Sequence, residues 1–360
     1  MAKAHNFNAG PAILPEQVVK ETAAAVLDFN GIGMGIMEMS HRSKDFDAVI
    51  KEAQSDLLQI MKLSPDEYEV LFLGGGASMQ FLMVPYNFLA KKADFILTGV
   101  WAKKAHKEGK FFGEAVIAAS SDDSNFNYLP KEFKFSPDAD YVHITTNNTI
   151  YGTEWKSLPD TGNIPLVADM SSDFLGMDFD FSKCSLIYAG AQKNIGPSGV
   201  TVVIIKKSWL EQKGKKGLPT MMDYKTHIDN ESMFNTPPCL PIFTVGRTFK
   251  WILQQGGVKA VKENNIKKAD VIYNVIDAHP DFYKGAVKNK EDRSLMNITW
   301  NLPTPELEAK FINEAKSQNM IGLKGHRSVG GVRASVYNAC PIESAQALAR
   351  FMEEFYKNNK

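Results

Sequence analysis

Lys193 has the clearest chemical potential in this sequence, because it lies in a loop directly after an apolar run. The segment at 185–199 reads SLIYAGAQKNIGPSG; its first five residues predict a buried strand, which the glycines and the proline end. No acidic residue of the loop can pair with the amine. An amine kept away from water and carboxylates has a lowered pKa, so more of it is unprotonated and able to attack a carbonyl carbon. The loop indicates Schiff-base chemistry, with a surface lysine on a hairpin as the alternative.

A carboxylate, Asp169, ends a second apolar run at 164–168. In parallel sheets, ligands lie beyond the carboxyl ends of the strands, so we expect Asp169 and Lys193 to face one crevice. A lysine that forms a Schiff base and a carboxylate that keeps a pyridine nitrogen protonated are the two groups that pyridoxal 5'-phosphate (PLP) requires. Taken alone, Asp169 reads as a strand-ending cap. Together, the two residues favour a PLP site.

Three consecutive glycines, at 74–76, separate a predicted strand at 70–73 from a helix that we expect to begin at Met79. Backbone amides at a helix start carry partial positive charge, and glycines let an anion approach them closely. The segment is neither a GxGxxG fingerprint nor a Walker A loop. It indicates a phosphate site, with a tight turn that needs positive φ as the alternative.

The elements around these residues predict an α/β fold with a layered sheet, because strand-like runs alternate with helical patterns. Apolar residues at 46–61 recur at spacings of three and four, which indicates an amphipathic helix packed on the core. The short return after Gly199 favours a hairpin, so we expect at least one antiparallel strand. The strand-like runs lie at 70–73, 95–97, 115–118, 141–145, 166–168, 186–189 and 201–205.

Past residue 256 the sequence changes to long polar helical stretches with fewer buried strands. Thr304 followed by Pro305 is a typical helix start. The Lys- and Gly-rich stretch at 206–218 predicts a solvated loop. We therefore expect a large domain at 16–255 and a smaller α/β domain at 256–360.

In order and over nearly the whole chain, these motifs resemble those of the phosphoserine aminotransferase family, which belongs to the class V aminotransferases. The resemblance implies a three-layer PLP-dependent transferase fold with a mostly parallel, mixed central sheet, and it adds residues 1–15 to the small domain. It implies reversible transfer of an amino group from glutamate to 3-phosphohydroxypyruvate in serine biosynthesis, giving O-phospho-L-serine and 2-oxoglutarate. The matching segments are FNAGPAILP, MEMSHRS, FLGGGAS, VADMSSDF, YAGAQKNIGPSG, FNTPP and LKGHRSVGGVRAS.

The resemblance also assigns roles around the cofactor. Lys193 and Asp169 are the catalytic pair. Trp101, which by itself reads as a core residue, stacks on the pyridine ring, and Thr149 contacts the cofactor with its hydroxyl. Many relatives have Asn-Glu-Thr at 147–149, so Asn148 is a departure. The phosphate is held by Ala77 through its amide, Ser78 and Gln192, and by Asn235 and Thr236 of the other subunit; this implies a homodimer with shared active sites.

Five cationic residues are candidates for the substrate site, because the arginine fork binds carboxylate and phosphate at two points. By resemblance Arg333 takes the α-carboxylate, and the other four form the pocket for the phosphate or the distal carboxylate. Their division of roles stays open, and solvated surface residues are the alternative for each His-Arg pair. The five are His41, Arg42, His326, Arg327 and Arg333.

Bulk properties narrow the class of protein. The 360 residues include 41 basic and 41 acidic side chains, a balance that argues against a nucleic-acid or membrane-surface protein. Three widely separated cysteines have no metal-ligand spacing and indicate a reducing compartment. No signal-like or membrane-spanning apolar run is present, so we expect a cytoplasmic enzyme without a metal.

Two alternatives remain at this point. One is another class V enzyme, such as a desulfurase or an alanine-glyoxylate aminotransferase. The other is a non-catalytic PLP-binding module. Whether 4-phosphohydroxy-L-threonine, a precursor in pyridoxine biosynthesis, is a further substrate also stays open.

Overall fold

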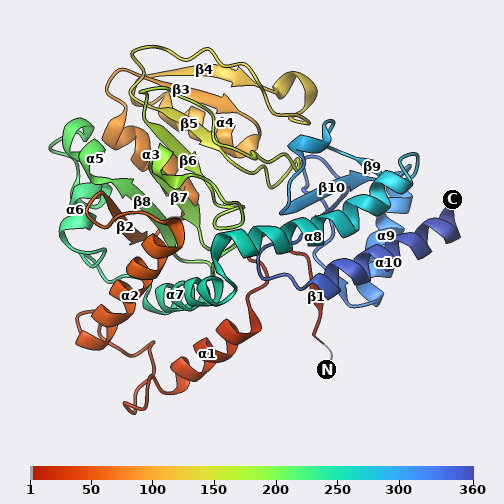
Figure 1. Ribbon diagram of the computed structural model, residues 1–360, viewed down its shortest axis with the longest axis horizontal. Coiled ribbons are helices and arrows are strands. Elements are labelled where there is room, and N and C mark those ends of the chain that lie inside the picture. Colours follow the sequence, from red (N-terminus) through yellow and green to blue (C-terminus); the bar gives the residue numbers. More distant parts are fainter. Residues whose placement is uncertain (1–2) are drawn as a thin grey trace.

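The computed structural model describes residues 3–360 and places helices on both faces of a seven-stranded sheet (Figure 1). Residues 1 and 2, which belong to the predicted small domain, lie outside the described range. The strand order is β2-β8-β7-β6-β5-β3-β4. Strand β8 runs antiparallel to both of its neighbours, β2 and β7, whereas the other pairs of this sheet are parallel, which confirms both the mixed sheet and the hairpin return after Gly199. The strands are β2 (Tyr68–Leu73), β3 (Lys92–Leu97), β4 (Glu114–Ser120), β5 (Val142–Thr145), β6 (Leu166–Asp169), β7 (Cys184–Gly190) and β8 (Thr201–Lys206).

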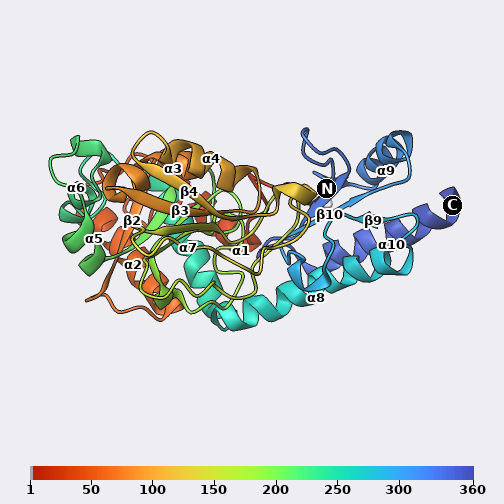
Figure 2. The same ribbon diagram turned by 90° about the horizontal axis from the view of Figure 1, so that it is seen from above.

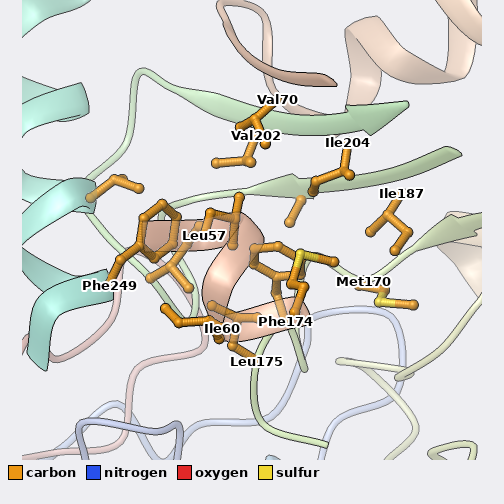
Figure 3. Packing of buried hydrophobic residues seen from close by; sticks show 14 of the residues in the cluster. Leu57, Ile60, Val70, Met170, Phe174, Leu175, Ile187, Val202, Ile204 and Phe249 are labelled. Carbon is orange, nitrogen blue, oxygen red and sulfur yellow. The ribbon is translucent and has the colours of Figure 1, made fainter. Parts of the chain in front are cut away.

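Successive side chains of a β-strand point to opposite faces of the sheet, so alternate residues of these strands face opposite helical layers. In β2, Val70 and Phe72 belong to one buried cluster, whereas Leu71 and Leu73 belong to another. The first cluster packs under α1 (Glu16–Leu27), α2 (Lys44–Met61) and α7 (Cys239–Gln254). Figure 3 shows side chains of α2 and α7 meeting those of β2 and β8 there. The second cluster packs under α3 (Gly76–Phe88) and α4 (Val100–Gly109), so the expected three layers are present.

A third buried cluster combines Phe7 and Ile13 with residues from 269 to 355. It lies under a three-stranded sheet and two helices beside the main sheet (Figure 2). Helix α8 (Gly257–Ala278) joins the two parts, since Val258 packs in the first cluster and Ile272 in the third. The remaining elements here are β1 (His5–Asn6), β9 (Lys284–Gly285), β10 (Asn297–Asn301), α9 (Pro305–Ser317), β11 (Met320–Ile321), β12 (Val332–Ser335) and α10 (Ile342–Asn359).

Helix starts test the local predictions most directly. The amphipathic helix expected at 46–61 is α2, and Ser43 caps it by accepting a hydrogen bond from Phe46 N at 3.2 Å. The start at Thr304 is also confirmed, because its hydroxyl oxygen accepts from Leu307 N. The solvated loop predicted at 206–218 is wrong in part: it contains the short helix α5 (Lys207–Lys213). Burial of Trp209 and Leu210 against the sheet outweighs the polar composition of this stretch.

Two further findings bear on the class of protein. No helix within residues 3–360 is long and apolar enough to cross a membrane. The same range contains no cluster of three or more histidine, cysteine or acidic side chains suited to hold a metal ion.

Between α5 and α7, the large part of the fold contains one more short helix, α6, which spans Tyr224–Asp229.

Candidate active site

Lys193 lies three residues beyond β7, in the segment that returns to β8. Its Nζ donates a hydrogen bond of 2.8 Å to Thr149 Oγ1 and lies 5.3 Å from the centroid of the Trp101 ring. Burial lowers the pKa of the amine to about 8, and the negative charge of Asp169 opposes this effect in part. The structure therefore favours a reactive amine over a surface lysine.

Asp169 is the last residue of β6, and its register partners are Thr145 on β5 and Tyr188 on β7. Because these strands are parallel, their carboxyl ends lie at one edge of the sheet, where the Lys193 loop also begins. The Asp169 carboxylate is buried and accepts a hydrogen bond of 2.9 Å from Ser171 N. Burial raises its pKa, while Ser171 and Lys193 act in the opposite direction. Asp169 and Lys193 thus lie near one another at this edge of the sheet, close enough for their charges to interact.

Trp101 lies in the first turn of α4, just beyond β3. Its indole Nε1 is buried and donates to no group in residues 3–360. The Nζ of Lys104, on the same helix, lies 4.4 Å from the centroid of the ring. Trp101 therefore presents an aromatic ring beside the Lys193 amine, held by packing rather than by a polar anchor.

Asn148, the departure from the family pattern, ties two of these loops together. Its Nδ2 donates to Thr98 O, and its Oδ1 accepts from Ile150 N and Tyr151 N at 3.4 and 3.3 Å. Any side chain at Gly99 would meet Asn148 at 2.5 Å. The amide of Asn148 thus fixes the loop of Thr149 against the loop of Trp101.

The triple glycine begins a helix earlier than the sequence predicted. Helix α3 starts at Gly76 rather than at Met79, because Gly75 and Gly76 take up φ values of 87° and 67° that L side chains rarely adopt. Ala77 and Ser78 therefore lie in the first turn, where backbone amides have no partner within the helix. A side chain at Gly74 or Gly76 would meet nothing within 4 Å. The loop leaves open space before free amides, which suits an anion.

Arg333, on β12 in the small part of the fold, contacts the loop that contains Thr149. Its Nη1 donates a hydrogen bond of 3.0 Å to Thr149 O, and its Nε is buried without a partner in residues 3–360. Arg333 and His326 both line a cavity of about 400 Å³ between the two parts of the fold. The positive charges of Arg333 and Arg327 help burial to lower the pKa of His326. The structure thus places His326, Arg327 and Arg333 close to one another, and the charge of Arg333 also acts on Lys193.

The other predicted cations lie elsewhere in the chain. His41 and Arg42 follow the loop after α1, and within residues 3–360 neither makes a hydrogen bond or an ion pair with Lys193 or Arg333. His41 Nε2 is buried without a partner in the described chain. A single chain therefore assembles only part of the predicted substrate site.

Asn235 and Thr236 form a turn before α7, and Asn235 Nδ2 donates to Thr236 O at 3.2 Å. Asn235 lines a small cavity together with Gly74 and Met79. Neither residue contacts Lys193 or Asp169 through a hydrogen bond or an ion pair in residues 3–360. Their predicted role toward another subunit stays a prediction.

Comparison with known proteins decides the family. The sequence model described as Aminotransferase class-V matches residues 4–348. This chain belongs to the class V aminotransferases. It is 56% identical over 358 residues to a phosphoserine aminotransferase of Bacteroides fragilis, with 99% of each chain covered. It also resembles the structure of phosphoserine aminotransferase from Bacillus circulans subsp. alkalophilus, with a TM-score of 0.96, 48% identity and 99% of each chain covered.

A structure described as PLP-bound phosphoserine aminotransferase, from Trichomonas vaginalis, superposes on this class V aminotransferase with a TM-score of 0.91. The two sequences are 38% identical, and the match covers 98% of this chain and 100% of the other. The resemblance read from the motifs is thereby confirmed over the full length.

Two residues that support the site in this class V aminotransferase were missed by the sequence reasoning. Gly10 closes over the lysine: a Cβ there would lie 3.1 Å from Lys193 Cγ, and its φ of 138° disfavours any side chain. Asn194 accepts a hydrogen bond of 2.8 Å from Asn338 N. Gly10 lies within the FNAGPAILP motif, which was the available signal; no local signal marks the pairing of Asn194 with Asn338.

Proposed function

We propose that this chain is a PLP-dependent phosphoserine aminotransferase, which moves an amino group between glutamate and 3-phosphohydroxypyruvate. The products are O-phospho-L-serine and 2-oxoglutarate, as in serine biosynthesis. The observation that carries the proposal is the Lys193 amine, bound to Thr149 Oγ1 at 2.8 Å, beside the buried Asp169 carboxylate. Full-length similarity to phosphoserine aminotransferases supports this substrate class over alanine-glyoxylate aminotransferase and over a non-catalytic module.

The residues present fit PLP. Lys193 would hold its aldehyde carbon, Asp169 its pyridine nitrogen, and Trp101 the face of its ring. The free amides of Ala77 and Ser78, with Gln192, would hold the phosphate in the open space before α3. When bound, PLP supplies an electron-withdrawing ring that stabilises negative charge at the substrate Cα.

Lys193 performs the proton transfers of both half-reactions. Its lowered pKa leaves a share of the amine unprotonated near neutral pH, so Nζ would accept the proton from Cα of the amino donor and, in the second half-reaction, would donate a proton to Cα of the acceptor. Thr149 Oγ1, which accepts a hydrogen bond from Nζ, orients the amine. The buried carboxylate of Asp169 would accept a hydrogen bond from the protonated ring nitrogen and so favour that proton.

Two sets of cationic residues would bind the substrate, one at its α-carboxylate and one at its distal anionic group. Arg333 Nε has no partner in residues 3–360 and would donate to the α-carboxylate, while Nη1 stays on Thr149 O. His326 and Arg327 would bind the phosphate of one substrate and the distal carboxylate of the other. We assign His41 and Arg42 to this same pocket in a homodimer, in which one protomer completes the site of its partner.

The same proposal covers the organisation of the chain. Residues 16–255 form the PLP-binding domain, and residues 1–15 with 256–360 form the small domain; the separate buried cluster of Phe7, Ile13 and residues 269–355 supports this division. Asn235 and Thr236 reach the cofactor phosphate of the partner. We also assign the enzyme to the cytoplasm, consistent with three free cysteines.

Spectral titration tests the function. Glutamate added to the PLP-loaded protein should convert the visible spectrum to that of the amine form, and 3-phosphohydroxypyruvate should restore it. Conversion by alanine and return by glyoxylate would instead identify an alanine-glyoxylate aminotransferase, and no conversion would identify a binding module. Parallel titration with 4-phosphohydroxy-L-threonine measures whether that compound is also a substrate.

A further inference from the structure

Two buried carboxylates, Asp173 and Glu154, have no part in the mechanism above, although the charges of Glu154 and Asp169 both act on Asp173. Asp173 is 1% exposed and Glu154 is not exposed at all. Each has one carboxylate oxygen, Asp173 Oδ2 and Glu154 Oε1, that is buried and accepts no hydrogen bond within residues 3–360. A buried acceptor without a donor is costly, so this pair of orphan oxygens calls for an explanation.

Thr146 brings the two carboxylates to one place. Its hydroxyl donates a hydrogen bond of 2.6 Å to Asp173 Oδ1, and its carbonyl accepts one of 2.8 Å from Trp155 N, next to Glu154. After burial, the negative charge of Glu154 is the main cause that raises the pKa of Asp173 well above its ordinary value. One proton between Asp173 Oδ2 and Glu154 Oε1 would satisfy both orphan oxygens at once.

The remaining partners indicate which acid carries that proton. Glu154 Oε2 lies 2.6 Å from Lys156 Nζ and accepts 2.9 Å from Leu295 N, so its negative charge is paired. Asp173 has no cation of its own among the described residues. Since an isolated buried charge is disfavoured, Asp173 is the neutral member and Glu154 the ionised one.

We propose that Asp173 is a positioning residue: as a neutral acid it donates its proton to Glu154 and thereby keeps a second negative charge away from Asp169. This inference rests on the proposed function, since it concerns the carboxylate that faces the cofactor. Asp173 is connected to Asp169 through Thr146, whose amide donates to Asp169 O at 2.9 Å. An ionised Asp173 would favour protonation of Asp169, which would then no longer hold a proton on the ring nitrogen.

Several charged or titratable groups act on Asp173 or are influenced by it, and each enters the expected pH dependence. Glu154 and Asp169 disfavour its ionisation, whereas Thr146 favours it. The charge of Asp173 in turn influences Lys193 and Tyr337. Lys156 is held to Glu154 and to Arg293 O, so it does not pair with Asp173.

Infrared spectroscopy of the apoprotein tests the protonation state without the cofactor. The difference spectrum between wild type and D173N should contain the carbonyl stretch of a protonated carboxylic acid at neutral pH, lost in the variant. This readout is independent of transamination, so it stands or falls separately from the proposed function. A wild-type protein without that band would overturn the proposal.

A pair of variants then separates charge from geometry. D173N places a neutral amide beside Asp169, and its NH₂ donates to Glu154. E154Q keeps a hydrogen bond across the same gap, but its amide donates to an ionised Asp173. In the PLP-loaded enzyme, E154Q should lower kcat/KM about tenfold more than D173N and shift the acid limb of its pH profile upward by about one unit.

Two controls complete the test. K156M removes the cation that favours the ionised form of Glu154, so the shared proton should move toward Glu154 and the acid limb should shift in the same direction as in E154Q. D173A removes the donor altogether, so D173N should recover function that D173A loses. Equal effects of D173N and E154Q on the pH profile would show a purely structural role and overturn the proposal. A D173N enzyme as damaged as D173A would do so too.

Discussion

The backbone amide of Asn338 donates a hydrogen bond of 2.8 Å to Oδ1 of Asn194, the residue next to Lys193. Asn338 also accepts from Asn265 Nδ2, on α8, at 2.8 Å. Helix α8 and the end of β12 are thus connected to the reactive lysine by side-chain amides. The position of Lys193 is therefore tied to the packing of the small part of the fold.

N194A should weaken this connection. The variant leaves Asn338 N without its acceptor and removes one of the two donors to Phe174 O, the other being Asn338 Nδ2, so we expect a loss of about 1–3 kcal/mol in the free energy of unfolding. We also expect a lower kcat. The control N194D keeps the acceptor for Asn338 N but loses the donor to Phe174 O. Denaturant unfolding with half-reaction kinetics measures both; an N194D enzyme no better than N194A in kcat would contradict the role of the Asn338 contact.

K193A should abolish the visible absorbance of the cofactor bound to lysine, because no other amine takes its place at Thr149 Oγ1. Absorption spectroscopy of purified protein reconstituted with PLP measures this directly. K193R provides the control, since it keeps a positive charge near Asp169 but cannot form the covalent link. An unchanged visible spectrum in K193A would refute the assignment of Lys193.

R333A should weaken binding of both glutamate and 3-phosphohydroxypyruvate, by about 10- to 100-fold, because each substrate presents an α-carboxylate to the same fork. Single-turnover half-reactions give the two half-saturation concentrations separately. R333K keeps the charge but loses the planar fork, so we expect an intermediate effect. Weakening of only one substrate would contradict a role at the α-carboxylate, which both substrates share.

The stability of the apoprotein should depend on pH through Lys193. Burial lowers the pKa of the amine to about 8 from 10.5, so its protonated form is disfavoured in the folded state. This penalty is present in full below about pH 8 and disappears as the pH rises to 10.5, the pKa of the amine in the unfolded chain. Below about pH 8, K193M should therefore exceed wild type in the free energy of unfolding, by on the order of 3 kcal/mol.

Denaturant unfolding at several pH values measures that difference, and it should shrink as the pH approaches 10.5. The exposed Lys267 offers a matched control, since K267M removes a lysine from the surface of α8. A constant difference between wild type and K193M across this range would contradict the burial argument.

Features encoded by local residue order were predictable. The apolar spacing at 46–61 predicted α2, and Thr304 with Pro305 predicted the start of α9. The position of Asp169 at the same edge of the sheet as the Lys193 loop was predictable because parallel strands present their carboxyl ends at one edge. Helix α3 begins at Gly76, three residues before the predicted start at Met79. The prediction was wrong because a glycine with positive φ can belong to the first turn of a helix as well as to a tight turn. The helix α5 was missed because burial of Trp209, not composition, decides its structure.

The sequence by itself singled out Lys193, Asp169 and the triple glycine as candidate site residues and determined the alternating layers, because each depends on residue type and short-range spacing. Only the tertiary structure decided the contacts between distant segments. Gly10 over Lys193, Asn338 on Asn194 and Glu154 beside Asp173 join residues whose separation leaves no periodic signal. Their hydrogen bonds and shared burial arise only when the sheet and the small part of the fold pack together, and burial then sets the pKa values of Lys193 and Asp169.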